Sequence, residues 1–320
     1  MKLKRFLRII GLTMLCLAAL GLCACGGDEQ GAGGRPEVTT DLLAQQPQNS
    51  VTVFYQAADS EVLVPLVYGI NSSRDTIWIA LDRLLAGPAD SFCRAVVPAG
   101  VKMKDLYYAN GTVNVSLTGD GELSAEEINA EAIFATVNNE LTEQKNEQAP
   151  VQVYYNDQPL FEKPFYCDAV NDFGGGREGS YVYFSDSQAM YVVPLKLAVN
   201  RDDYKQPEDY LAALLKAWQN EPPAASGLYT AALSDCRLAV SLSDGLLTLD
   251  FDRELSEISG TAQETLFVNT LLATLADVEY VEAVRFTVNG EPVAMLSHGT
   301  DLSEPLPVPH DEFVFNVVNN

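Results

Sequence analysis

The chain has 320 residues with 44 acidic and only 20 basic side chains, which gives a formal net charge of −24 at neutral pH. A protein this acidic repels the phosphates of nucleic acids and anionic lipid head groups, so neither is expected as a partner. The length allows two modest domains, and an apolar fraction of 47% is ordinary for a globular protein.

The first 25 residues have the layout of a bacterial lipoprotein signal peptide. Basic residues precede an apolar run from Ile9 to Leu22, and Cys25 follows shortly after it. Cleavage before Cys25 would remove residues 1–24 and leave a lipid-modified N-terminal cysteine. An ordinary secretory signal with a chance cysteine is the alternative, whereas the run is too short for a transmembrane helix. We therefore expect a protein held by lipid at the extracytoplasmic face of the cell membrane, with a mature charge of −28 because four basic residues are removed.

An internal repeat follows a stretch, residues 25–50, whose Gly, Gln, Pro and Asp content predicts a flexible tether. Val53-Phe54-Tyr55 aligns with Val182-Tyr183-Phe184, and Leu63-Val64-Pro65-Leu66 with Val192-Val193-Pro194-Leu195, both at an offset of 129. Later elements keep their order at offsets up to 134, for example Thr136-Val137 with Thr270-Leu271. Chance similarity would not preserve that order.

Each copy opens with two strands and continues with a helix. In the first copy, Ile77, Leu81, Leu84 and Leu85 recur at the spacing of one helical face. Gly87-Pro88 ends this helix, because glycine adopts the left-handed cap and proline cannot continue the hydrogen-bond ladder. The helix of the second copy starts near Pro207 and has the apolar face Leu211, Leu214, Leu215 and Trp218.

A hairpin, a second helix and a closing strand complete each copy. Asn110-Gly111 and Asp244-Gly245 are the residues that a type I′ turn requires, since both central positions have positive φ. The second helices have the apolar stripes Ile133, Val137 and Leu141 in the first copy and Phe267, Leu271 and Leu275 in the second. The closing strands are residues 151–155 and 284–288.

The pattern predicts an α+β fold with two tandem repeats of about 110 residues, each β-β-α-β-β-α-β with two helices packed on a mostly antiparallel sheet. The predicted boundaries are 51–165 for the first domain, 166–180 for a linker, 181–296 for the second domain and 297–320 for a C-terminal tail. Apolar residues near the end of the tail predict an added strand or packing onto the second copy; they are Phe313, Val314, Phe315, Val317 and Val318.

The linker contains Gly174-Gly175-Gly176-Arg177-Glu178-Gly179, which formally fits the GxGxxG pattern of dinucleotide-binding sites. That pattern requires a strand before it and a helix after it, whereas here it precedes a strand. We therefore expect a flexible linker and no cofactor.

Catalytic chemistry has few candidate residues. The chain has two histidines, His298 and His310, both in the tail and expected to be solvated, and no hydrolase or metalloprotease motif. Asp250, Asp252 and Glu254 alternate on a predicted strand and are a candidate calcium site or acid/base pair, against the plainer interpretation of an outward polar face. Catalytic residues are therefore expected to be absent, and the protein is expected not to be an enzyme.

Four tyrosines are candidates for a partner-binding surface, against the plainer interpretation that they fill a pleated sheet; they are Tyr107, Tyr108, Tyr154 and Tyr155. An exposed sheet edge that accepts another strand is a comparable route to assembly. Besides the candidate lipid site, the mature chain keeps Cys93, Cys167 and Cys236. One disulfide with a free thiol and three unpaired thiols are both open.

These elements in this order resemble the GerM domain, present twice over about residues 50–305. The residues that carry the resemblance are Val53-Phe54-Tyr55, Val64-Pro65, Leu84-Leu85-Ala86-Gly87-Pro88, Asn110-Gly111, Asn269-Thr270-Leu271 and Val288-Asn289-Gly290. The resemblance implies a fold similar to ring-building motifs. It also implies a non-enzymatic scaffold in a cell-envelope assembly of Gram-positive sporulation or germination, with envelope proteins or peptidoglycan as partners.

Two other functions remain open from the sequence. A solute-binding lipoprotein of a transporter fits the two similar halves, although such proteins usually have parallel α/β lobes. An envelope glycan hydrolase would rely on carboxylates such as those of Asp250 and Asp252.

Overall fold

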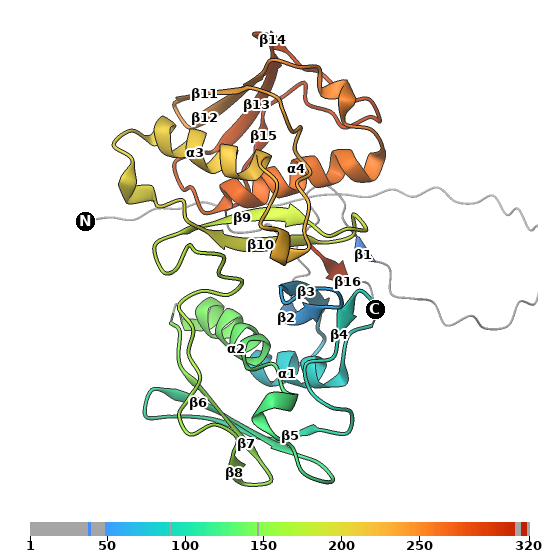
Figure 1. Ribbon diagram of the computed structural model, residues 1–320, viewed down its shortest axis with the longest axis vertical. Coiled ribbons are helices and arrows are strands. Elements are labelled where there is room, and N and C mark those ends of the chain that lie inside the picture. The colour runs from blue at the N-terminus through green and yellow to red at the C-terminus, as the bar shows by residue number, and fades with distance from the viewer. Residues whose placement is uncertain (1–37, 40–48, 90, 146, 311–314, 319–320) are drawn as a thin grey trace, which may run out of the picture. The chain divides into compact units, whose positions relative to one another are not determined.

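The computed structural model describes residues 38–39, 49–89, 91–145, 147–310 and 315–318. The predicted signal peptide, Cys25 and most of the predicted tether lie outside these residues. Within the described ranges, no helix has both the length and the apolar character needed to cross a membrane. The described residues belong to one compact unit, in which the chain builds two consecutive α+β repeats (Figure 1).

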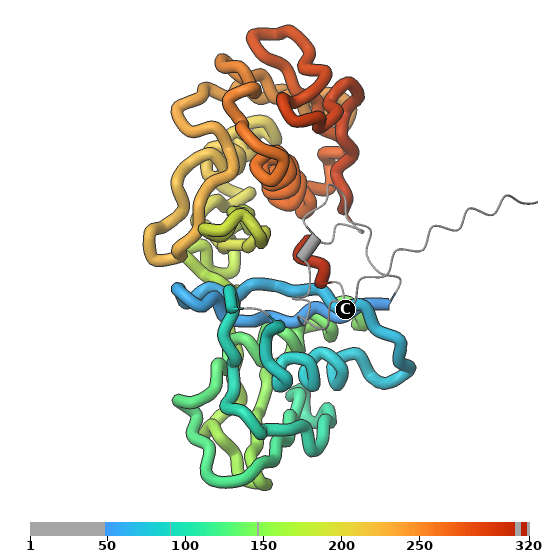
Figure 2. The backbone as a smooth tube through the Cα atoms, turned by 90° about the vertical axis from the view of Figure 1, so that its right-hand side faces the viewer, coloured from blue at the N-terminus to red at the C-terminus, as the bar shows by residue number. Residues whose placement is uncertain are grey.

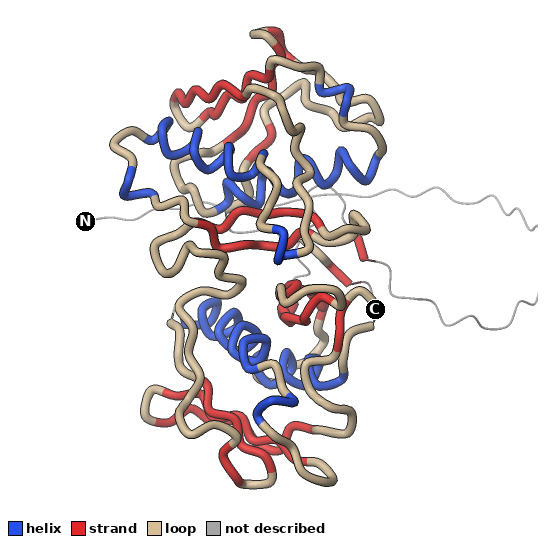
Figure 3. Tube along the Cα trace, in the orientation of Figure 1, coloured by secondary structure: helices blue, strands red, loops and turns tan. Residues whose placement is uncertain are grey.

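In the first repeat, two helices lie between a strand hairpin and a separate sheet (Figures 1 and 3). The hairpin consists of β2 (Ser50–Ala57) and β3 (Leu63–Gly69), and the helices are α1 (Thr76–Ala86) and α2 (Ala130–Lys145). The sheet has the order β5 (Lys102–Ala109), β6 (Thr112–Thr118), β7 (Val151–Tyr155), β8 (Gln158–Pro159). The short strand β4 (Cys93–Arg94) pairs with β2, and a 3-10 turn at Ala125–Glu127 precedes α2.

The second repeat has the same architecture. Its hairpin consists of β9 (Ser180–Ser185) and β10 (Val192–Leu197), and its helices are α3 (Pro207–Gln219) and α4 (Thr261–Ala276). Its sheet has the order β11 (Leu238–Ser243), β12 (Leu246–Phe251), β13 (Ala283–Val288), β14 (Glu291–Pro292), with β15 (Leu306–Pro307) also on β13. The 3-10 turns are Arg201–Asp203, Ala224–Ser226 and Leu255–Glu257.

The predicted α+β class and the predicted hairpin turns are confirmed. The φ angles are 53° and 74° at Asn110 and Gly111, and 49° and 79° at Asp244 and Gly245, as a type I′ turn requires. β6 pairs in parallel with β7, and β12 with β13, because a helix crosses between the two strands of each pair. The strands of each repeat divide between two sheets rather than one, so the helices are covered on two sides.

One hydrophobic core extends through both repeats. In α1 the predicted apolar stripe is buried at Ile77, Leu81 and Leu84. In the second repeat, the fully buried Trp218 donates its indole N–H to Thr270 Oγ1 at 2.9 Å and lies 5.4 Å from the ring of Phe267. A large aromatic side chain with a satisfied donor anchors α3 to α4.

The linker between the repeats is packed, which contradicts the prediction of a flexible segment. Asp172 accepts hydrogen bonds from the backbone N–H groups of Gly174 and Gly176, at 3.0 and 2.9 Å. A Cβ on Gly175 would lie 2.6 Å from the carbonyl oxygen of Leu197, and one on Gly179 would meet the same oxygen. These two glycines therefore allow close backbone packing, which explains the GxGxxG pattern without a cofactor.

The C-terminal tail adds a strand, as predicted, but to the first repeat and not to the second. β16 (Val317–Val318) pairs in parallel with β3, and β1 (Val38–Thr39) pairs with β16 (Figure 2). The ring of Phe315 packs edge-on against Tyr183 of the second repeat, with centroids 5.2 Å apart. The tail thus contacts both repeats. Phe313 and Val314 lie outside the described residues.

Candidate functional site

Asn171 connects the two repeats through the backbone of β3 and β10. Its Oδ1 accepts the N–H of Leu63 at 2.7 Å, and its Nδ2 donates to the carbonyl oxygens of Leu63 and Pro194 at 2.8 and 2.9 Å. The side chain is nearly inaccessible to solvent, with 5% exposure. Its amide therefore satisfies three backbone groups that no water could reach.

Asn316, near the end of the chain, makes the same three bonds with the roles of the repeats exchanged. Its Oδ1 accepts the N–H of Val192 at 2.9 Å, and its Nδ2 donates to the carbonyl oxygens of Val192 and Pro65 at 2.8 Å each. Leu63 and Val192, and likewise Pro65 and Pro194, are equivalent by the repeat offset of 129. We call this symmetric pair of residues, Asn171 and Asn316, the asparagine brace.

Local geometry explains why asparagine and proline occupy these positions. Both asparagines of the brace have left-handed backbones, with φ of 52° at Asn171 and 60° at Asn316. Asparagine tolerates this conformation better than most residues. In a strand, a residue's nitrogen and carbonyl face the same edge. Pro65 and Pro194 therefore present to the brace a carbonyl acceptor and no N–H donor that would need a partner.

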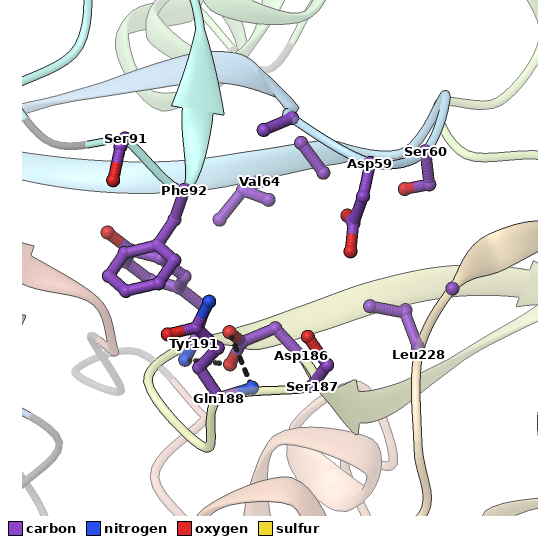
Figure 4. A pocket seen from close by; sticks show the side chains of 13 residues that line it. Asp59, Ser60, Val64, Ser91, Phe92, Asp186, Ser187, Gln188, Tyr191 and Leu228 are labelled. Atoms are coloured by element: carbon purple, nitrogen blue, oxygen red, sulfur yellow. Dashed lines mark hydrogen bonds between the residues drawn. The ribbon is translucent and has the colours of Figure 1, made fainter.

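A small cavity lies beside the brace, between the turns of the two hairpins (Figure 4). Its volume is about 180 Å³, below the 300–1,000 Å³ or so that small-molecule sites usually have. The rings of Phe92 and Tyr191, both in its lining, lie edge-on to each other with centroids 6.1 Å apart. Asp186, on its wall, accepts the N–H groups of Met190 and Tyr191 at 2.7 and 2.8 Å. The carboxylate of Asp186 is thus committed to the turn of the second hairpin, and Asp59 is the other carboxylate that lines the cavity.

The three predicted metal ligands have separate environments. Asp250 accepts hydrogen bonds from the Thr287 hydroxyl at 2.6 Å and the Gly290 N–H at 2.7 Å, which lower the pKa of its carboxyl group. Asp252 accepts the Arg237 N–H at 2.8 Å, which lowers its pKa, whereas Glu254 is exposed. In the described part of the chain, no three His, Cys, Asp or Glu side chains form a group that could hold a metal ion. The geometry therefore adds no support to a calcium site.

The four predicted tyrosines divide between the two faces of the first sheet. Tyr107 and Tyr154 lie on the outer face, and burial together with the nearby Tyr154 raises the pKa of Tyr107. Tyr108 lies toward the helix side, under the ammonium of Lys145 at 5.1 Å, and Tyr155 is buried. An aromatic surface of all four tyrosines does not form, although Tyr107 is 45% exposed.

Both histidines contact groups of the second repeat through their ring nitrogens. His298 Nδ1 lies 3.2 Å from Oε1 of the buried Glu264, which also accepts the hydroxyl of Thr300 at 2.8 Å. His310 places one ring nitrogen 2.7 Å from the carbonyl oxygen of Ala276 and the other 2.8 Å from that of Val281. Both side chains are nevertheless exposed, which agrees with the expectation of solvated residues.

Cys93, Cys167 and Cys236 form no disulfide with one another. The sequence left open either one disulfide with a free thiol or three thiols, and the structure has three thiols. Burial, together with the nearby Glu131 and Asp168, raises the pKa of Cys167 to about 12, which disfavours its thiolate.

Sequence reasoning missed the residues that position the two repeats. Asn171 lay in the segment taken for a flexible linker, and Glu264 on a helix was not singled out. A signal for the brace was present, because each repeat is followed by an apolar residue and an asparagine, Val170-Asn171 and Phe315-Asn316.

Comparisons with known proteins agree with the architecture. The sequence profile of the Germane family, described as sporulation and spore germination, matches residues 52–161 and 181–294. The solved tandem GerMN domains of the sporulation protein GerM from Bacillus subtilis match with a TM-score of 0.54 at 19% identity, covering 85% of this chain and 100% of that one. The first GerMN domain alone of the same protein matches with a TM-score of 0.34 at 20% identity, over 40% of this chain and 96% of that one. No curated protein sequence matches the chain.

Proposed function

Because the chain belongs to the Germane family of sporulation and spore germination proteins, we propose that it is a non-enzymatic scaffold or adaptor of a cell-envelope assembly. In this proposal Cys25 carries a lipid that holds the protein at the extracytoplasmic face of the membrane. The two repeats present surfaces to envelope proteins or to peptidoglycan.

The observation that carries the proposal is the asparagine brace. A scaffold needs its binding surfaces at a fixed separation, since flexible linkage would lose the effective concentration that two joined surfaces provide. Asn171 and Asn316 connect the two hairpins through buried hydrogen bonds, and the core is continuous through both repeats. The sheets β5–β8 and β11–β15 lie on the far sides of the helices from these hairpins, where partners can reach them (Figure 1).

The roles of the polar side chains support a non-enzymatic function. General acid–base catalysis by histidine needs a ring nitrogen within hydrogen-bond reach of substrate. Here the ring nitrogens of His310 face backbone carbonyls, and Nδ1 of His298 faces Glu264 and the N–H of Gly260. These side chains serve tail packing.

The anchoring part of the proposal is tested by lipid labelling. Cells that express the full chain are grown with radioactive palmitate, and the protein is followed in membrane and soluble fractions. We expect label and membrane association in the wild type and loss of both in Cys25→Ala. Secretion of an unlabelled wild-type protein would support the ordinary secretory signal instead.

The scaffold part is tested by crosslinking in intact cells and mass spectrometry of the captured proteins. The control is a membrane-tethered segment, residues 1–50, without the two repeats. Enrichment of envelope-assembly proteins by the full chain alone supports the proposal. Recovery of only a transporter permease, with a melting temperature that rises on addition of a solute, would replace it by the solute-binding function.

A further inference from the structure

The strand β11 is an open edge of the second-repeat sheet. It pairs with β12 alone, and no other described segment pairs with it (Figure 1). The two-residue turn makes Ser243 and Leu246 a hydrogen-bonded pair, and Asp252 donates its N–H to the carbonyl of Arg237 at 3.1 Å. Odd-numbered residues of β11 therefore bond to β12, and the backbone groups of Leu238, Val240 and Leu242 point outward.

A groove runs along this edge, between β11 and α3. Its volume is about 610 Å³, and its apolar lining consists of Ala212, Leu233, Leu238 and Val240. The side chains of Leu238, Val240 and Leu242 face the helix layer, as the buried Leu247 and Leu249 do, yet each is only half-buried. A strand added at the edge would cover them.

The equivalent edge of the first repeat is protected against such pairing. β5 carries Lys102, Lys104 and Asp105, and its register shifts between Met103 and Asp105. Charges and a bulge on an edge strand are the usual devices that prevent strand addition. β11, with the sequence Leu-Ala-Val-Ser-Leu-Ser, has no charge and a continuous register. Two copies of one fold thus differ in whether their edge is open.

We propose that β11 binds β11 of a second copy of this chain, antiparallel about a two-fold axis at Val240. This register uses all the outward groups, since Leu238 then faces Leu242 of the partner copy and Val240 faces its own counterpart. Any other register that pairs even-numbered residues of the two copies leaves some of these backbone groups unpaired. The sheet would continue across the axis, and the two grooves would be covered together.

Charge favours the same arrangement. Arg237 Nε lies 3.5 Å from Asp252 Oδ2 of its own copy. In this register Arg237 also lies opposite Ser243 of the second copy and next to its Asp244, so each end of the pairing brings this cation near an anion of the other copy. The charged groove-lining residues balance as well, with Lys216 and Arg237 against Glu221 and Asp235. On a chain with a net charge of −24, such a neutral border allows two copies to approach.

A matched pair of cysteine variants tests the register. Val240→Cys and Leu106→Cys are each made in the full chain and oxidised in membranes. Leu106 serves as the control because it is the equivalent outward residue of β5, by the offset of 134. Paired Cα atoms about 5.5 Å apart fall within disulfide range. We expect a covalent dimer with Val240→Cys and only the background of the three native cysteines with Leu106→Cys. Equal dimer formation by both would overturn the proposal.

Sedimentation equilibrium of the detergent-solubilised full chain tests the association itself. The substitution Val240→Pro removes one outward N–H per copy and leaves the hydrogen bonds to β12 intact, so we expect it to weaken the dimer about tenfold or more. Its melting temperature should stay unchanged, and Leu106→Pro should leave the dimer intact. A wild-type chain that is monomeric at every concentration, or a dimer that Val240→Pro leaves unchanged, overturns the proposal. Protection of β11 amides only on addition of a different protein would assign the edge to that protein instead.

Discussion

At the scale of a single residue, the buried side-chain amide of Asn171 is expected to contribute strongly to the free energy of unfolding. Replacing it by leucine, Asn171→Leu, leaves Leu63 N–H and the carbonyls of Leu63 and Pro194 without partners in a site closed to water. At about 1–3 kcal/mol for each unsatisfied group, we expect a loss of about 3 kcal/mol or more of unfolding free energy. Urea denaturation of the full chain measures it.

The control for this substitution is Asn289→Leu. Asn289 has nearly the same left-handed backbone, with φ of 49°, but lies exposed in a turn. Its substitution reports the conformational cost alone, about 1–2 kcal/mol. Equal losses for the two variants would mean that the amide bonds of Asn171 add nothing.

The carboxyl group of Glu264 predicts that the stability of the fold depends on pH. Burial acts to raise its pKa, but the hydrogen bonds donated by His298 and Thr300 outweigh burial, and the pKa lies below the ordinary value of 4.5. A carboxyl group with a depressed folded-state pKa stabilises the fold above its unfolded pKa, and this contribution is lost as the pH falls through the folded value. Wild-type stability should therefore drop below about pH 4.5.

The variant Glu264→Gln should lack that part of the acid-dependent drop and should be about 1–3 kcal/mol less stable at pH 7. Urea midpoints between pH 3 and pH 7 measure both effects. The matched control is the exposed Glu279→Gln, which should follow the wild type. If Glu264→Gln loses stability with pH as steeply as the wild type, another carboxylate causes the acid sensitivity.

At the scale of elements, the two repeats provide a natural comparison of helix caps. Asp75 caps α1 through a hydrogen bond from the Trp78 N–H at 3.2 Å, whereas Gln206, at the same position before α3, makes no side-chain cap bond. We expect Asp75→Ala to cost about 1 kcal/mol and Gln206→Ala to cost nearly nothing. Thermal denaturation followed by circular dichroism compares them. A similar loss for both would argue that the cap bond contributes little.

The elements themselves were predictable because their signals are local. Helical spacing identified α1, and Asn110-Gly111 and Asp244-Gly245 identified the hairpins. The pairing of strands was not predictable, because a period of two says which side chains share a face but not which strands meet. The division of each repeat into a hairpin and a sheet therefore appeared only in the structure.

The alignment of the repeats shows a second limit. The sequence offset pairs Thr136 with Thr270, yet the threonine that accepts the N–H of the outer hairpin strand is Thr136 for Phe54 and Thr274 for Tyr183, at 3.0 Å in both. The two positions differ by one helical turn. Because a helical face recurs about every 3.6 residues, hydrophobic pattern alone does not distinguish a helix from the same helix moved by a turn.

The candidate site was the least predictable part. Its residues come from the linker and from the tail, 145 positions apart in the chain, and act only after both repeats have folded. Asp250 and Asp252 stood out in the sequence because carboxylates alternate there, but each is explained by its own hydrogen bonds. Sequence patterns identify chemistry-bearing residues better than residues that fix geometry.

At the scale of the whole molecule, the contacts between the two repeats predict that they unfold cooperatively. A continuous core and the two residues of the asparagine brace couple the repeats. Differential scanning calorimetry of the wild type should therefore show a single unfolding transition for residues 49–320. The double variant Asn171→Ala with Asn316→Ala should separate it into two. Two transitions already in the wild type would mean that the repeats are thermodynamically independent.

The pairing of β1 with β16 and of β16 with β3 has a mechanical consequence. A pull on the chain from its N-terminal side first reaches a contact of two residue pairs, Val38 with Val318 and Thr39 with Val317. The pairing of β16 with β3 is not loaded by this pull, because the chain continues from β1 to β2. Under tension the contact of β1 therefore separates before the hydrophobic core is strained. The pairing of β1 with β16 is thus a release point, which can open while the two repeats stay joined.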